Sequence, residues 1–141
     1  NGLLRECVIR FKFRTADTGC HIEEDVPADF CYINVDADLL IRAVANIMDN
    51  AVHACGPGGT LRIGAYRQAG AWHVEIADEG PGIPPENLLK IFEPFFTTRA
   101  DGNGLGLAFA RQVVEAHGGS IRARNREAGG ALFHIELPVD E

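Results

Sequence analysis

The strongest chemical signal in the sequence is a short glycine-rich run, Gly102-Asn103-Gly104-Leu105-Gly106-Leu107. Glycines let a backbone approach a ligand closely and turn its N–H groups outward. The run leads into an apolar-periodic segment, residues 105–117, which is predicted to be a helix. A helix N-terminus adds unpaired N–H donors and a partial positive charge, so this junction suits phosphate groups. Alone the run is a weak signal, because many such runs are only turns.

A second candidate element is the acidic loop Asp78-Glu79-Gly80-Pro81-Gly82, which directly follows a predicted strand. An ionised carboxylate only accepts hydrogen bonds. Asp78 can therefore accept the exocyclic amino proton of adenine, whereas guanine presents a carbonyl oxygen at the matching position and would be repelled. The alternative is an ordinary acidic turn, which is common for Asp and Gly.

Two asparagines form the third element. Asn46 and Asn50 are four residues apart on a predicted helix, so they share one face. An amide carbonyl oxygen is a hard, neutral ligand that suits Mg²⁺, which shares its coordination shell with phosphates and water. For the pair alone, a solvated polar helix face is the stronger alternative.

Aromatic and then polar residues lie just before the glycine-rich run: Phe92, Phe95, Phe96, Thr97, Thr98 and Arg99. Aromatic side chains can anchor the base of a mobile lid, and the Arg99 guanidinium can reach a terminal phosphate. Core packing is the alternative, and we expect Phe92 and one of the other two phenylalanines to do both. The pair Gly129-Gly130, before the last predicted strand, predicts only a turn when taken by itself.

The elements that must position these residues follow from apolar periodicity. The predicted helices cover residues 2–14, residues from Asp36 or Asp38 to the break at Gly56, and residues 105–117, with a short helical turn after Pro84-Pro85. The predicted strands cover residues 20–25, 30–35, 60–66, 71–77, 120–125 and 131–137. Helices with one apolar stripe and strands with alternating faces predict a two-layer α/β sandwich, one sheet with helices on one side.

Length and composition indicate one globular domain. The 141 residues are 46% hydrophobic and 23% charged, which is enough for a real core. The formal net charge of −7 argues against nucleic acid as the main partner, since that binding needs a basic surface. The four cysteines form no C-x-x-C pair, so we expect reduced thiols in the cytoplasm. No apolar run approaches the length of a membrane span, and no secretory signal is visible.

The order and spacing of these elements resemble the catalytic, ATP-binding domain of sensor histidine kinases, in the gyrase–Hsp90–histidine kinase–MutL superfamily. The motifs are matched in order along nearly the whole chain: the N box by residues 36–54, the G1 box by Asp78-x-Gly80-x-Gly82, the F box by residues 92–96, the G2 box by residues 102–107 and the weaker G3 box by Gly129-Gly130. The short lid between Phe96 and Gly102 resembles kinases of the nitrogen-regulation and dicarboxylate-sensing type.

The resemblance implies an α+β fold of the Bergerat type, in which a mixed sheet is covered on one face by helices. It implies ATP and Mg²⁺ as cofactors, with Asn50 binding the metal and Asp78 reading adenine. The residues implied to bind ATP are Asn50, His53, Asp78, Gly80, Gly82, Phe96, Thr97, Thr98, Gly102, Gly104, Leu105 and Gly106. The implied catalytic residues are Asn46, Asn50 and Arg99.

Four residues depart from the family pattern. His53 stands where the family often carries lysine, and Arg99 replaces a common lysine but keeps the charge. Ala131 and Leu132 stand where many members carry threonine, so a hydroxyl contact near the adenine aspartate is lost or left to water.

Asn46 decides which chemistry the resemblance implies. The superfamily's true ATPases, such as gyrase, carry at this position a glutamate that activates water as a general base. An amide cannot take that proton, so we expect the site to hold Mg·ATP without fast hydrolysis. Catalysis is then positioning and charge neutralisation by Mg²⁺, Arg99 and the loop amides, with the γ-phosphate passing to a histidine elsewhere.

No histidine of this chain is predicted to be the acceptor. His21 begins a run similar to that of the acceptor helix, but Gly19 and Pro27 bound it and predict a strand. His73 and His134 are predicted to be exposed sheet residues. We therefore expect residues 1–14 to be a connector helix from a missing dimerisation and phosphoacceptor region, and residues 15–141 to be the catalytic domain.

The expected partners are that dimerisation domain and a response regulator, whose aspartate would receive the phosphoryl group. No nucleic acid and no direct membrane contact by this domain are expected, and the expected location is the cytoplasm. Two alternatives remain: an anti-sigma-factor-type serine kinase of the same fold, and a degenerate interaction domain that binds no nucleotide. Asp78, Asn50 and the glycines argue against the second.

Overall fold

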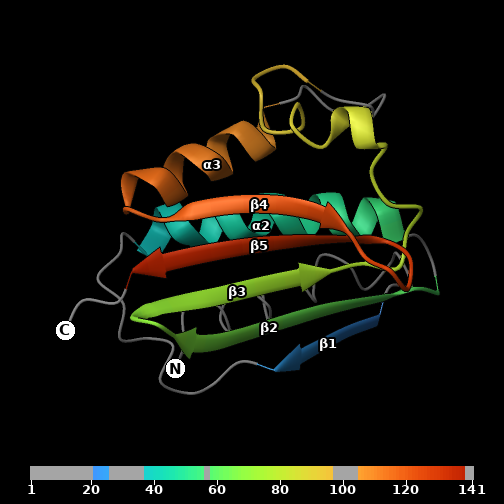
Figure 1. Ribbon diagram of the computed structural model, residues 1–141, viewed down its shortest axis with the longest axis horizontal. Helices are drawn as coiled ribbons and strands as arrows, with labels where there is room; N and C mark the ends of the chain where they lie inside the picture. The colour runs from blue at the N-terminus through green and yellow to red at the C-terminus, as the bar shows by residue number, and fades with distance from the viewer. Residues whose placement is uncertain (1–20, 26–36, 56–57, 97–104, 139–141) are drawn as a thin grey trace.

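A computed structural model describes residues 21–25, 37–55, 58–96 and 105–138 (Figure 1). The strands are β1 (His21–Asp25), β2 (Thr60–Gln68), β3 (Ala71–Ala77), β4 (Ser120–Asn125) and β5 (Ala131–Pro138). The helices are α2 (Ala37–Cys55), α3 (Gly106–Ala116) and the short 3-10 helix η3 (Pro85–Asn87). The predicted elements within this part of the chain are confirmed, with strand ends that differ by at most two residues. The predicted connector helix and the predicted strand at residues 30–35 lie outside the described residues.

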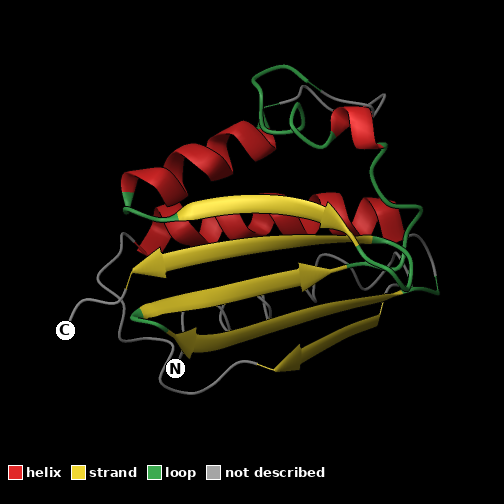
Figure 2. Cartoon of the chain, in the orientation of Figure 1, coloured by secondary structure: helices red, strands yellow, loops and turns green. Residues whose placement is uncertain are grey.

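The strands form one mixed, five-stranded sheet in the order β1-β2-β3-β5-β4. β1 pairs with β2 in parallel, and the other neighbouring pairs are antiparallel. The β2–β3 hairpin closes through Ala69 and Gly70, whose positive φ angles of 55° and 76° fit a tight two-residue turn. Helices form the second layer (Figure 2), with α2 packed on β2 and β3 and α3 packed on β4 and β5. This is the two-layer α+β sandwich that the sequence predicts.

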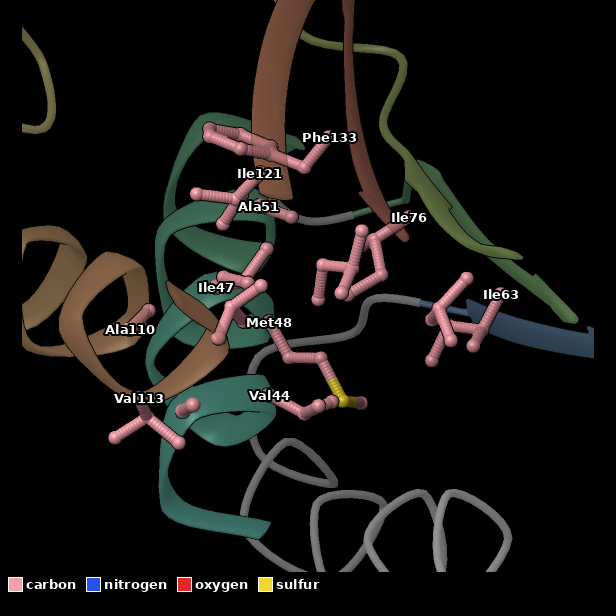
Figure 3. Close-up of a cluster of buried hydrophobic side chains, with 14 of the residues drawn as sticks. Val44, Ile47, Met48, Ala51, Ile63, Ile76, Ala110, Val113, Ile121 and Phe133 are labelled. Atoms are coloured by element: carbon pink, nitrogen blue, oxygen red, sulfur yellow. The ribbon is translucent and has the colours of Figure 1, made fainter. Parts of the chain in front are cut away.

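The core lies between the sheet and α2. Side chains alternate along β2 and β3, and the residues directed to the core are buried: Leu61, Ile63 and Ala65 on β2, and Trp72, Val74 and Ile76 on β3. Figure 3 shows Val44 and Met48 of α2 directed toward Ile63 and Ile76, while Ala110 and Val113 of α3 approach α2 from its other side. α2 thus packs between the sheet and α3 and contacts both.

One edge of the molecule collects the ends of several elements. α2, β3 and β4 end toward this edge, and α3 and β5 begin toward it, on the right-hand side of Figure 1. The predicted binding residues of the described chain come from these ends. Among the described helices, none is long and apolar enough to cross a bilayer.

Candidate functional site

Asp78 directly follows β3 and is only 1% exposed, the one buried charged side chain in the described parts of the chain. Its Oδ1 accepts hydrogen bonds from the backbone N–H groups of Gly80, at 2.9 Å, and Ala131, at 3.1 Å. Two donors on one oxygen fix the orientation of the carboxylate. No hydrogen bond from a described residue reaches Oδ2. The two backbone donors thus leave Oδ2 as the acceptor that the described residues do not use.

The turn between β4 and β5 holds the backbone of Asp78. The Arg126 guanidinium donates to the Asp78 carbonyl oxygen at 2.9 Å, and the Arg126 N–H closes the turn on the Gly130 carbonyl at 2.8 Å. Gly130 has φ +87°, and a Cβ there would overlap the Asp78 carbonyl, 2.8 Å from its carbon atom. The predicted turn at Gly129-Gly130 is confirmed, and Gly130 in addition packs against the Asp78 backbone.

Two contributors to this arrangement were not predicted from the sequence: the Arg126 guanidinium and the backbone N–H of Ala131. The family resemblance had indicated Gly130, through the G3 box, and the position of Ala131 near Asp78. The threonine hydroxyl expected from the family is absent, and the Ala131 N–H binds Asp78 directly. The glycine pair before β5 is the signal that indicates the close approach to Asp78 as well as the turn, since glycine permits both positive φ and close backbone contact.

A stripe on α2 connects the loop after Asp78 with the start of α3. The Asn46 Nδ2 donates to the Gly106 carbonyl at 3.2 Å. Further along the helix, the carbonyl of Ala54 lies against Gly80, where any side chain would collide with it. Asn50 lies midway between these contacts and is half-buried. The prediction that Asn46 and Asn50 share a face of the helix is confirmed, and Asn50 lies between the loop after Asp78 and the start of α3.

The two helices run in opposite directions along this stripe. The Arg42 guanidinium lies 4.8 Å from the centre of the Phe109 ring, one turn before the contact between Asn46 and Gly106. Asn50 and His53 therefore lie further along α2 than the point where α3 begins, and His53 is exposed. Within the described parts of the chain, no side-chain hydrogen bond caps α3 at Leu105, and its first turn carries no acidic residue. Its first N–H groups and partial positive charge thus face the region beside Asn50.

The aromatic residues divide as the sequence predicts. Phe92 is buried and meets Phe133 edge to face, with ring centres 6.2 Å apart. Phe96 is half-buried and packs on the core, whereas Phe95 is 74% exposed. The expectation that Phe92 and one other phenylalanine join the core is confirmed.

The predicted site residues divide between the described and the undescribed parts of the chain. Those in the described part are Asn46, Asn50, His53, Asp78, Gly80, Gly82, Phe96, Leu105 and Gly106. The others, Thr97, Thr98, Arg99, Gly102 and Gly104, lie outside the described residues. Within the described ranges, no cluster of three or more His, Cys, Asp or Glu residues is suited to a metal ion.

The histidines of the sheet differ from the prediction. His73 and His134 are half-buried, and the Nδ1 of His73 lies 2.8 Å from the Nε2 of His134. The ring of Tyr66 stacks on His73 with centres 4.9 Å apart, and its hydroxyl donates to Glu75 at 3.2 Å. The prediction that both are simply exposed is wrong, because β3 and β5 are neighbours and bring the two rings together.

This pair predicts that the stability of the fold falls as the pH drops below about 6.5. Burial, the largest cause, lowers the pKa of His134; Glu75 and Glu136 oppose this effect, and His73 and Arg122 add to it. The unfolded chain then takes up the proton first, so stabilisation present above the ordinary pKa is lost toward the lower folded pKa.

Thermal unfolding of the chain at pH values of about 7.5, 6.5 and 5.5, which bracket the ordinary histidine pKa, measures this dependence. We expect His134→Gln to flatten it, and His53→Gln, at an exposed histidine, to leave it as it is. An unchanged slope in His134→Gln would contradict the assignment.

Comparison with known proteins identifies the chain's relatives. Residues 35–141 match the family model described as "Histidine kinase-, DNA gyrase B-, and HSP90-like ATPase". The chain belongs to this ATPase family. It is 44% identical over 109 residues to the sensor histidine kinase ZraS of Salmonella typhimurium, an alignment that covers 76% of this chain and 23% of that protein. The chain therefore spans about a quarter of the length of this curated relative.

Solved structures place the chain among the catalytic domains of the ATPase family. The catalytic domain of the histidine kinase ThkA superposes with a TM-score of 0.86 at 32% identity, over 97% of this chain and 90% of that one. ThkA in complex with the response regulator TrrA matches with a TM-score of 0.83 at 30% identity, over 98% of this chain and 40% of that one. The chain is thus a histidine-kinase-type ATP-binding domain.

Proposed function

We propose that this chain binds Mg·ATP and, within a two-component sensor histidine kinase, transfers the γ-phosphate to a histidine of a dimerisation domain outside the chain. A response-regulator aspartate would then receive the phosphoryl group, a partnership supported by the complex of ThkA with the response regulator TrrA. The observation that carries the proposal is the buried Asp78 carboxylate, held by two backbone amides on one oxygen with the other available.

Asp78 is proposed to select adenine. Its Oδ2 accepts the exocyclic amino proton. The backbone N–H groups of Gly80 and Ala131 bind Oδ1 and keep the carboxylate from turning away. Guanine would place a carbonyl oxygen against the carboxylate, and two acceptors repel each other.

Asn50 is proposed to hold Mg²⁺ together with the ATP phosphates. The site fits this metal because Asn50 is half-buried on α2 and its amide oxygen is a hard, neutral ligand that can share the Mg²⁺ coordination shell with phosphates and water. When bound, Mg²⁺ neutralises charge on the phosphates. The N–H groups at the start of α3 would face the same phosphates, and Arg99 and His53 would supply further positive or donor groups.

Asn46 is proposed to favour transfer over hydrolysis. Its Nδ2 is bound to the Gly106 carbonyl, which joins α2 to α3 beneath the phosphate region. Its amide has no basic group with which to deprotonate water. The site would therefore keep the γ-phosphate intact until the acceptor histidine arrives.

Titration of the chain with ATP and GTP, with and without Mg²⁺, tests the proposal. We expect tighter binding of ATP than GTP, dependence on Mg²⁺, and negligible phosphate release by the chain alone. Addition of a dimerisation domain that carries the acceptor histidine should yield an acid-labile phosphoprotein, as expected for phosphohistidine. Brisk phosphate release without a partner would contradict the role of Asn46, and no ATP binding at all would overturn the proposal.

A further inference from the structure

We infer that Asn125 is a positioning residue for the nucleotide site, an inference that rests on the proposed function. Asn125 is the last residue of β4 and lies outside every motif used to predict the site. Its Oδ1 accepts from the backbone N–H of Ile83 at 2.7 Å, and its Nδ2 donates to the Ile83 carbonyl at 2.8 Å. One side chain thus binds both polar groups of a residue that precedes it by 42 positions.

The chemistry of the asparagine amide suits this task. A primary amide presents a donor and an acceptor side by side, so it can pair with one residue's N–H and C=O as a neighbouring strand would. Aspartate would keep the acceptor but lose the donor, and alanine would lose both. Because two hydrogen bonds act on the same residue, they fix its direction as well as its place.

Asn125 and its neighbour hold opposite ends of one loop, residues 78–83, which we call the Asp78 loop. Arg126 donates to the Asp78 carbonyl at 2.9 Å, and Asn125 binds Ile83. Between these ends, Gly80 rests against the carbonyl of Ala54 at the end of α2. The loop is therefore fixed at three points by two elements that are distant in the sequence.

Gly82 lies very close to the Asn125 side chain, whose two hydrogen bonds to Ile83 we call the clamp. Its φ is +84°, and a Cβ at Gly82 would lie 2.8 Å from the Asn125 Oδ1. The glycine thus allows the side chain of Asn125 to reach the Ile83 backbone. A loop held in this way before a ligand arrives costs less conformational entropy on binding.

The consequence is that Asn125 sets affinity and base selectivity without touching the nucleotide. Removing the two Asn125 hydrogen bonds frees residues 81–83, while Asp78 keeps its own contacts with Gly80 and Ala131. Binding must then order the loop, and a less fixed loop discriminates less well between adenine and guanine. We expect Asn125→Ala to bind ATP about tenfold more weakly, with a smaller ratio of ATP to GTP affinity.

The experiment compares Asn125→Ala and Asn125→Asp with Glu127→Ala, a matched control at an exposed position of the same turn. ATP and GTP are titrated at a temperature at which thermal unfolding shows each variant to be folded. Amide hydrogen exchange at Ile83 is measured without nucleotide. We expect faster exchange and weaker ATP binding in Asn125→Ala and wild-type values in Glu127→Ala. Asn125→Asp should also exchange faster and bind ATP more weakly, because it keeps the bond from the Ile83 N–H but sets a carboxylate oxygen against the Ile83 carbonyl oxygen.

The outcomes separate this inference from the proposed function. If the wild-type chain binds ATP and folded Asn125→Ala binds it equally well, the inference is overturned while the proposed function stands, whatever the exchange at Ile83. Unchanged exchange at Ile83 overturns it as well, because the clamp then does not hold the loop. If the wild-type chain binds no ATP, the proposed function fails and the role in affinity fails with it.

Discussion

Asp78→Asn is expected to weaken ATP binding about 100-fold and to leave the fold intact. The asparagine Oδ1 can still accept from the N–H groups of Gly80 and Ala131, so the loop keeps its internal bonds. The Oδ2 acceptor of Asp78 becomes the Nδ2 donor of asparagine, which would meet the donating amino group of adenine. One favourable hydrogen bond to a charged group becomes a contact between two donors.

Glu79→Gln is the matched control for this substitution. Glu79 is the exposed neighbour of Asp78, and its Oε1 accepts from the Thr60 N–H at 3.0 Å, a bond that the glutamine oxygen can keep. It removes the same charge one residue away, so it should retain ATP affinity. Titration of both variants with ATP and GTP decides the matter: the ratio of ATP to GTP affinity should fall in Asp78→Asn alone. Equal ATP affinity in Asp78→Asn and wild type would remove Asp78 from the site.

The sequence predicted the elements well because their signals are local. The hairpin of β2 and β3 follows from alternating residues around a short turn, and α3 follows from its apolar stripe. Asp78 and Asn50 were predicted because the motifs of the family occur in the same order along this chain. In the structure, the end of β3 and the end of α2, which carry these residues, lie at the same edge. Both kinds of signal need no knowledge of which strands are neighbours.

The support of the site could not be predicted in this way. Asn125 reaches Ile83, and Ala131 reaches Asp78, only because β5 lies between β3 and β4 in the sheet. Strand order is not encoded in the periodicity of any one segment. The error on His73 has the same origin, since alternation gives the face of a strand but not the side chain that lies diagonally opposite on its neighbour.

The contact between Gly130 and Asp78 gives the second large expected effect. Gly130→Ala should lower the free energy of unfolding by about 2 kcal/mol more than Gly129→Ala does. Both glycines have positive φ, +87° and +104°, so alanine is strained at each position by about 1–3 kcal/mol. Only at Gly130 does the added Cβ also overlap the backbone of Asp78, whereas nothing lies within 4 Å of a Cβ at Gly129.

Urea unfolding gives the free energy of unfolding of each variant. The backbone strain from positive φ is common to both, so the difference between them reports the overlap of the Gly130 Cβ with Asp78. Relief of the overlap requires the Asp78 backbone or the turn to move. ATP affinity should therefore fall in Gly130→Ala at a temperature at which the variant is folded, and stay near the wild-type value in Gly129→Ala. Equal losses of stability in the two variants would mean that the turn yields without displacing Asp78. The β4–β5 turn would then be a connection between strands and not a support of the carboxylate.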